Sequence, residues 1–205
     1  NDLGDEVSVN SKCFTLSPTF APTESPTFRP TPVPSFSPTS TPTKCEDTPA
    51  IIDFEGFADG SIVSILPGVT VRGKESSRNG NSAMILADTA GFRFEGQGNV
   101  LIISEDGNKK NPVDSANGGT FFFHFDHPVG LESFILLGVE KEEVGTVTLF
   151  DAFNRFLFNA KISGNGVNSK TTIDLGSTDN VKSMVIRLVG PGAIDDIEYI
   201  IRCEP

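Results

Sequence analysis

The sequence predicts an all-β protein: an antiparallel, jelly-roll-like β-sandwich preceded by an extended polyproline II linker and a lone N-terminal strand. Three observations predict this fold. After residue 45, short segments rich in Val, Ile and Phe alternate with clusters of Gly, Asn, Asp and Ser that are typical of turns. No window shows the 3.6-residue apolar period of a helix. Eight of the 14 prolines lie in residues 17–44, which sets that segment apart by composition.

We expect three parts in this chain of 205 residues. Residues 1–16 are a strand segment that belongs to a preceding copy of the domain or is donated to a neighbour. Residues 17–44 are the linker, and residues 45–205 are the β-sandwich domain. Within the domain we expect strands in residues 51–57, 68–73, 81–88, 99–106, 120–127, 131–139, 146–152, 156–162, 171–176, 183–190 and 194–201.

Seven of the linker prolines recur at every fourth position from Pro18 to Pro42, and each is followed by Thr or Ser. Proline restricts its own φ and drives the residue before it into extended geometry, so we expect a polyproline II rod with about three residues per turn. A four-residue period then turns each proline by about 120° from the last and distributes substituents around the rod. A flexible, undecorated spacer is the alternative.

The linker also predicts covalent O-glycans as a modification of the chain. There is no Asn-X-Ser/Thr sequon, so any glycan must be O-linked. Hydroxylated proline, Thr and Ser are the natural acceptors of O-glycans in extracellular chains. The expected positions of hydroxylation or O-glycosylation are Pro18, Thr19, Pro22, Thr23, Pro26, Thr27, Pro30, Thr31, Pro34, Ser35, Pro38, Thr39, Pro42 and Thr43.

Two of the three cysteines, Cys45 and Cys203, stand at the two ends of the predicted domain. A disulfide between them would join the first strand to the last, and it would imply an oxidising, extracellular compartment. Three unrelated buried thiols are the alternative. The remaining Cys13 then needs a partner outside this domain.

A short internal sequence repeat suggests that partner. The segment GDEVSVNSKC ends at Cys13 and matches DDIEYIIRC, which ends at Cys203, in its acidic pair, its alternating strand and its final basic residue and cysteine. If the match is not due to chance, residues 1–13 are the last strand of a preceding copy, and Cys13 pairs with a neighbouring copy. Tandem domains or donor-strand exchange would follow, and both predict end-to-end self-association.

The formal net charge of −11 disfavours nucleic acid and anionic membranes as partners and favours cation binding. No apolar run approaches the roughly 20 residues that a membrane-spanning helix needs. No leader-like segment stands at Asn1, so we expect a mature or internal start.

Four carboxylates are candidate metal ligands. Asp53 and Glu55 are expected on one side of the first strand, and Asp195 and Asp196 open the last strand. If these strands are neighbours, the carboxylates meet at one edge, where oxygen ligands suit a structural Ca²⁺. Ordinary solvated acids at a strand edge are the alternative.

No constellation of catalytic residues stands out, so we expect no enzyme activity. His124 and His127 lack a metal-binding or nucleophile frame around them. Trp is absent, Tyr199 lies in an apolar strand, and the Phe residues are expected to fill the core. Sugar binding by aromatic stacking is therefore unsupported by the sequence.

The strings IIDFEGFADGSIV, NSAMILADT, GNVLIISED, GTVTLFDAFN and GAIDDIEY resemble a β-sandwich module of secreted bacterial and algal surface proteins, over nearly all of residues 50–202. The resemblance implies a jelly-roll-like fold and an extracellular setting, and related modules often carry a structural Ca²⁺. The proline repeat resembles linkers of stramenopile and diatom surface glycoproteins and of glycan-coated microalgal fibrils.

Together these features predict a structural extracellular glycoprotein that forms fibrils or tandem arrays, in which β-sandwich domains are joined by O-glycosylated rods. Its partners would be other copies of itself and glycans. The alternative is a Ca²⁺-dependent carbohydrate-binding or adhesion module on a glycosylated stalk.

Overall fold

The computed structural model describes residues 45–77, 84–88 and 97–203, with the backbone alone for 84–88. The predictions for the first 44 residues, which include Cys13, the linker and its O-glycan positions, lie outside the described residues. Lys44–Pro205 forms a compact unit, which begins one residue before the predicted domain boundary. The strands are β1 (Thr48–Ile52), β2 (Ile65–Leu66), β3 (Val69–Glu75), β4 (Met84–Asp88), β5 (Asn99–Ile103), β6 (Gly119–Leu137), β7 (Gly145–Phe150), β8 (Phe156–Ile162), β9 (Lys170–Leu188) and β10 (Ala193–Ile201).

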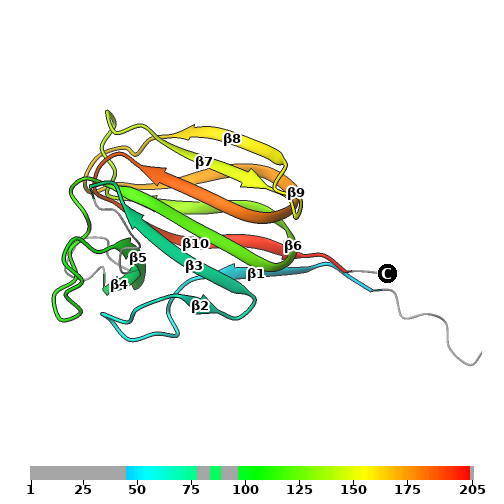
Figure 1. The fold of residues 1–205 in the computed structure, drawn as a ribbon, viewed down its shortest axis with the longest axis horizontal. Helices are drawn as coiled ribbons and strands as arrows, with labels where there is room; N and C mark the ends of the chain where they lie inside the picture. The colour runs from blue at the N-terminus through cyan, green and yellow to red at the C-terminus, as the bar shows by residue number, and fades with distance from the viewer. Residues whose placement is uncertain (1–44, 78–83, 89–96, 204–205) are drawn as a thin grey trace, which may run out of the picture. The chain divides into compact units, whose positions relative to one another are not determined.

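All strand pairings are antiparallel, which confirms the predicted fold class, and no helix among the described residues is long and apolar enough to cross a membrane. The two longest strands, β6 and β9, belong to both layers of a sandwich (Figure 1). The first part of β6 lies between β3 and the end of β9, and the second part lies between β10 and the start of β9.

One layer therefore has the strand order β2-β3-β6-β9-β7-β8. The other has the order β4-β5-β10-β6-β9, with β1 also paired to β10. The prediction of separate strands at 120–127 and 131–139, and at 171–176 and 183–190, is wrong. The turn-like residues between them form bulges in one continuous pair, as the register shifts between His124 and Ser133 show.

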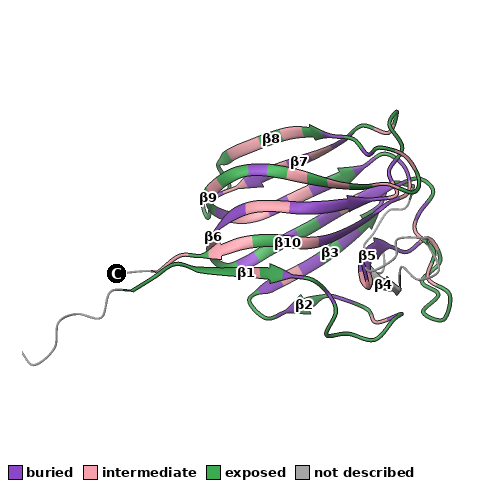
Figure 2. Ribbon diagram, turned by 180° about the vertical axis from the view of Figure 1, so that it is seen from behind, coloured by how far each residue is buried: buried purple, intermediate pink, exposed green. Residues whose placement is uncertain are grey.

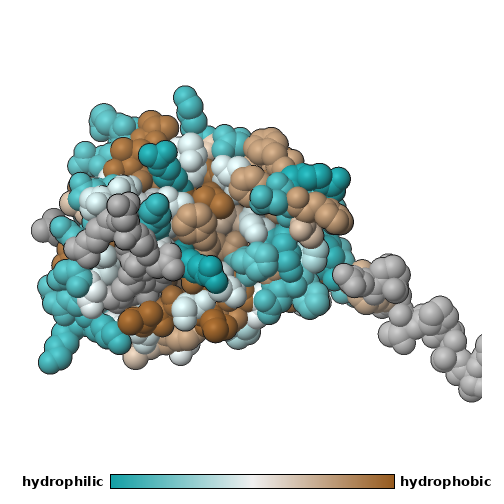
Figure 3. All heavy atoms as spheres, viewed as in Figure 1, coloured by the Kyte–Doolittle hydropathy of each residue, from teal (hydrophilic) through white to brown (hydrophobic). Residues whose placement is uncertain are grey.

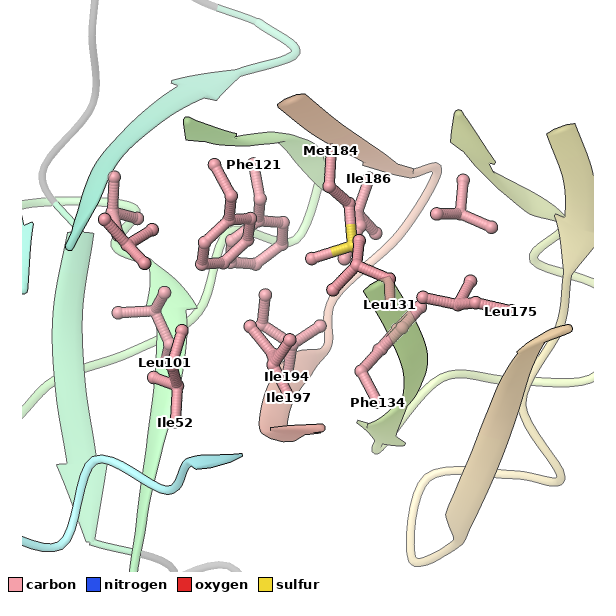
Figure 4. Close-up of a cluster of buried hydrophobic side chains, with 14 of the residues drawn as sticks. Ile52, Leu101, Phe121, Leu131, Phe134, Leu175, Met184, Ile186, Ile194 and Ile197 are labelled. Carbon is pink, nitrogen blue, oxygen red and sulfur yellow. The ribbon is translucent and has the colours of Figure 1, made fainter. Parts of the chain in front are cut away.

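Side chains alternate between core and solvent along most strands (Figure 2). The inward side chains of both layers meet in one large apolar cluster, in which Phe121, Leu131, Met184 and Ile194 are almost completely buried (Figure 4). The expectation that Phe residues fill the core holds for only part of them. Among the described residues, four Phe side chains are instead exposed, namely Phe57, Phe122, Phe153 and Phe156.

The first and last strands are neighbours, as predicted: β1 pairs with β10 from Thr48 opposite Ile201 inwards. Beyond this pair, Cys45 and Cys203 form the predicted disulfide, with their Cα atoms 5.7 Å apart. The domain therefore begins and ends at one point, which we call the neck (Figure 1).

A charged cluster reinforces the neck. Arg202 Nη1 donates to Asp47 Oδ2 at 2.6 Å, and Arg202 also pairs with Asp179. The backbone N–H of Cys203 donates to Asp47 Oδ1 at 3.0 Å. These two donors lower the pKa of Asp47 below its ordinary value.

A matched pair of Phe variants tests this description of the core. Phe134 is fully buried, whereas the side chain of Phe156 is 63% exposed. We expect Phe134→Ala to lower the free energy of unfolding by about 3–5 kcal/mol, because it leaves a cavity between the layers. Phe156→Ala should cost less than about 1 kcal/mol. Denaturant unfolding of both variants measures this, and equal losses would contradict the assigned layers.

Candidate cation site beside β10

The first predicted pair of ligands does not lie on a strand. β1 ends at Ile52, and the next buried side chain, Phe54, has a left-handed backbone with φ 57°. This conformation is unusual for a bulky residue and turns the chain sharply. Asp53 and Glu55 therefore lie in a turn, where Asp53 Oδ1 accepts a hydrogen bond from the N–H of Glu55 at 3.2 Å. The expectation that both face one side of the first strand is wrong.

The second predicted pair lies at a bulge in β10. Asp195 is opposite Ile135 of β6, and the register then shifts before Glu198. Asp196 adopts φ 43°, a left-handed conformation that Asp tolerates better than most residues. As a result the Asp195 side chain is completely buried, whereas Asp196 stays partly exposed.

Gln97 joins the two aspartates. Its amide Nε2 donates to Asp195 Oδ2 at 2.6 Å and to Asp196 Oδ2 at 3.0 Å. Sequence reasoning missed Gln97, because a single Gln between two glycines carries no motif. It lies next to Asp195 only because β5, which begins at Asn99, pairs with the start of β10.

Glu55 is held against the same place by the start of β5. The N–H of Asn99 donates to Glu55 Oε1 at 3.0 Å, and Asn99 Nδ2 donates to the carbonyl of Phe57 at 2.7 Å. Gly98 allows this approach, since a Cβ on it would overlap the Glu55 carboxylate and its φ of 67° favours glycine.

Burial and charge act together on Asp195. The pKa of Asp195 is raised to about 7, mainly by burial and in smaller part by the nearby charges of Asp196 and Glu55, while hydrogen bonds from Gln97 and from the backbone of Asp196 act to lower it. Its second oxygen, Oδ1, is buried and has no hydrogen-bond partner among the described residues. A buried carboxylate oxygen without a partner costs free energy, so this group has unused capacity to bind a proton or a cation.

The donor set fits a hard cation in part. Glu55, Asp195 and Asp196 supply carboxylate oxygens. Gln97 directs its Nε2 at the two aspartates, and the Oε1 of the same amide is a further oxygen that could bind a cation. Among the described residues, however, no three Asp, Glu, His or Cys side chains already converge as a metal site. Nothing brings Asp53 to this cluster, since its described contact is the local one with Glu55.

No protein-family model matches the sequence, and no curated protein matches it. Among solved structures, a fucose binding module of Streptococcus pneumoniae aligns with TM-score 0.36 and 13% identity, over 70% of this chain and 99% of that one. A CBM32 module produced by Clostridium perfringens aligns with TM-score 0.36 and 8% identity, over 70% of this chain and all of that one. The lectin binding domain of Lectinolysin, complexed with Lewis b, gives TM-score 0.32 and 7% identity, over 45% and 71%. Similarity at this level does not bear on what this chain binds.

The raised pKa of Asp195 predicts a pH dependence of stability in the cation-free protein. A carboxyl whose pKa is higher in the folded state stabilises the fold while it is protonated, and this contribution is lost as the pH rises through about 7. Between pH 5 and 8 in chelator, we expect the wild type to lose on the order of 2 kcal/mol relative to Asp195→Asn, after a discount for solvent screening.

Denaturant unfolding at several pH values measures this difference. Asp106→Asn, in an exposed loop, makes the same change of charge and is the control. A difference between the wild type and Asp195→Asn that stays constant across the range would contradict the assignment.

Proposed function

We propose that the chain is a structural extracellular protein that assembles end to end, with the disulfide-closed domain carried on an O-glycosylated proline-rich segment. The neck is the observation that carries this proposal. Cys45 and Cys203, the Arg202 cluster and the β1–β10 pair place the beginning and the end of the domain at one covalently closed point. Because both chain ends leave the domain at the neck, successive domains can be linked in tandem without the linking segment crossing a domain core.

The neck also favours one form of assembly over another. Donor-strand exchange needs an unfilled strand position in the receiving domain. In the described domain, the place between β6 and the strands β1 and β5 is filled by its own β10. We therefore propose tandem copies in which each domain contains all of its own strands and is linked to the next copy through its neck.

The setting and the modification follow from sequence chemistry. A disulfide that closes 158 residues is typical of an oxidising, extracellular compartment. The prolines followed by Thr or Ser supply acceptors at regular intervals along the rod. No catalytic step is part of this proposal.

Electron microscopy of the native material tests the assembly. We expect fibres or chains of globular domains at regular spacing, and monodisperse single domains would overturn the proposal. Intact mass separately tests the modification, since a mass equal to that of the bare sequence would exclude O-glycans while leaving the assembly open.

Single-molecule pulling on both ends of the full chain tests the neck. The tension passes through the disulfide, so the oxidised domain should release none of the chain between its cysteines. In the Cys45→Ser/Cys203→Ser variant, unfolding should release roughly 55 nm, because about 158 residues extend by some 3.5 Å each. A release of that length from the oxidised protein would show that the disulfide does not carry the tension.

A second candidate function is a Ca²⁺-dependent carbohydrate-binding or adhesion module. The observation that favours it is the buried Oδ1 of Asp195, which has no hydrogen-bond partner in the described part of the chain. Ca²⁺ would bind Glu55, Asp195, Asp196 and the Gln97 oxygen, and it would join the turn after β1 to the start of β10. This binding would be linked to folding, since the ligands come from three separate segments.

Thermal unfolding with Ca²⁺ or with chelator tests this second candidate. Ca²⁺ at about 100 times its dissociation constant should stabilise the wild type by about 2.7 kcal/mol. Asp195→Asn and Glu55→Gln should abolish most of the shift, whereas Asp106→Asn should retain it. Equal shifts in all variants would show that Ca²⁺ acts elsewhere. Glycan binding that chelator abolishes would favour the adhesion function over a purely structural one.

A further inference from the structure

The outer face of the β3–β6–β9–β7–β8 layer differs in charge from the rest of the protein. Its outward side chains form three rows that cross the five strands, because direct cross-strand partners share a face. The first row is Lys74, Thr120, Arg187, Thr146 and Lys161. The second is Arg72, Phe122, Val185, Thr148 and Asn159, and the third is Thr70, His124, Ser183, Phe150 and Phe156.

These 15 positions hold four Lys or Arg residues and no Asp or Glu, in a chain with 16 basic and 27 acidic residues. None of the four cations forms an ion pair within the described part of the chain. No described acidic side chain therefore forms a close pair with these charges. We call these three rows the basic face.

The first row spaces its cations regularly. Lys74, Arg187 and Lys161 are exposed and lie on every second strand, with a Thr on each strand between them. Adjacent strands are about 4.8 Å apart, so cations along this row repeat at roughly 10 Å. A linear polymer with regularly spaced anionic groups, lying across the strands, would meet these charges in turn.

The rows beside it supply the other groups that a sugar polymer needs. A groove is lined by Thr70, Arg72, Phe122, His124 and Ser183, and Phe122 is 38% exposed within it. Hydroxyl and imidazole groups can hydrogen-bond sugar hydroxyls, and His124 Nδ1 already lies 3.0 Å from Ser183 Oγ. The exposed ring offers an apolar surface against which a sugar ring can pack.

We propose that the basic face binds a linear anionic polysaccharide whose charge comes from carboxylate or sulfate groups. This site is separate from the acidic cluster at the start of β10, and the inference does not depend on the proposed fibre. Arg72 and Arg187 would pair with anionic groups, and Phe122 would pack against a sugar ring between them.

A second copy of this chain is the competing occupant, because the other layer has an acidic outer row of Glu198, Ser133 and Asp174. Protein interfaces, however, are depleted of Lys at their centres and enriched in large apolar groups. The basic face has a cation on every second strand, and on the side shown in Figure 3 apolar residues are scattered among hydrophilic ones. These features fit a hydrated, charged polymer better than a protein surface.

Affinity electrophoresis of the full, unmodified chain tests the proposal. Polygalacturonate supplies carboxylates, dextran sulfate supplies sulfates, and uncharged dextran is the neutral control. We expect retardation by at least one anionic polymer and none by dextran. Retardation should weaken with salt, because the contacts are exposed charges, and should be unchanged by chelator. Equal retardation by dextran, or none by either anionic polymer, would overturn the proposal.

Charge-reversal variants locate the site. Lys74→Glu/Arg187→Glu should weaken binding by tenfold or more, whereas Lys109→Glu/Lys141→Glu makes the same change of net charge at exposed loop positions and should weaken it less than twofold. Phe122→Ala should weaken binding severalfold without removing the salt dependence. Equal losses in both double variants would show that overall charge, not this face, governs binding.

Two further measurements keep the result decisive. Thermal unfolding of every variant checks the fold, and Lys74→Gln/Arg187→Gln replaces the reversal variant if that one unfolds early. Sedimentation of the protein alone identifies self-association: concentration-dependent association that the reversal variant abolishes would assign the face to a second copy and overturn the polysaccharide proposal.

Discussion

The pairing of β6 with β9 is the constraint on which the rest of the structure depends. Both strands run through both layers, so a single register fixes which side chains enter the core on each side of the sandwich. A slip by one residue would turn Phe121 and Phe123 to solvent and carry Phe122 and His124 into the core. The free-energy cost of exposing two buried rings makes this register specific. The same register determines which residues are neighbours in the three rows of the basic face.

β10 links the two ends of the domain to the same framework. Ile194 and Ile197, on either side of the aspartate pair, are buried in the core that the β6–β9 pair shapes. The beginning of β10 holds the acidic cluster, and its end continues to Arg202 and the neck. The bulge at Asp196 lets one strand do this, since it changes which side chains face inward between Asp195 and Ile197. One strand therefore connects the acidic cluster to the neck.

The sequence predicts those features that local pattern or end-to-end chemistry determines. The cysteine positions alone predict the neck, and the acidic pair at Asp195 predicts where carboxylates gather. The left-handed turn at Phe54 could not be predicted, because nothing in a Phe signals it, and it removes Asp53 from the cluster. Residues 121 to 123 are three identical Phe side chains, so their sequence does not indicate which of them faces solvent. Pairing with β3 and β9, which lie far away in sequence, determines this.

The net charge of the whole chain does not describe the charge of the basic face. A charge of −11 disfavours anionic partners if the charge is spread evenly. The sheet separates it instead: side chains alternate across each strand, so cations that are far apart in sequence collect on one outer face while Glu198 and Asp174 lie on the other. Screening confines each face's field to about 10 Å at moderate salt, so a polymer on the basic face experiences mainly the local cations. Composition therefore limits how the protein behaves at long range, whereas recognition at contact depends on the register of the strands.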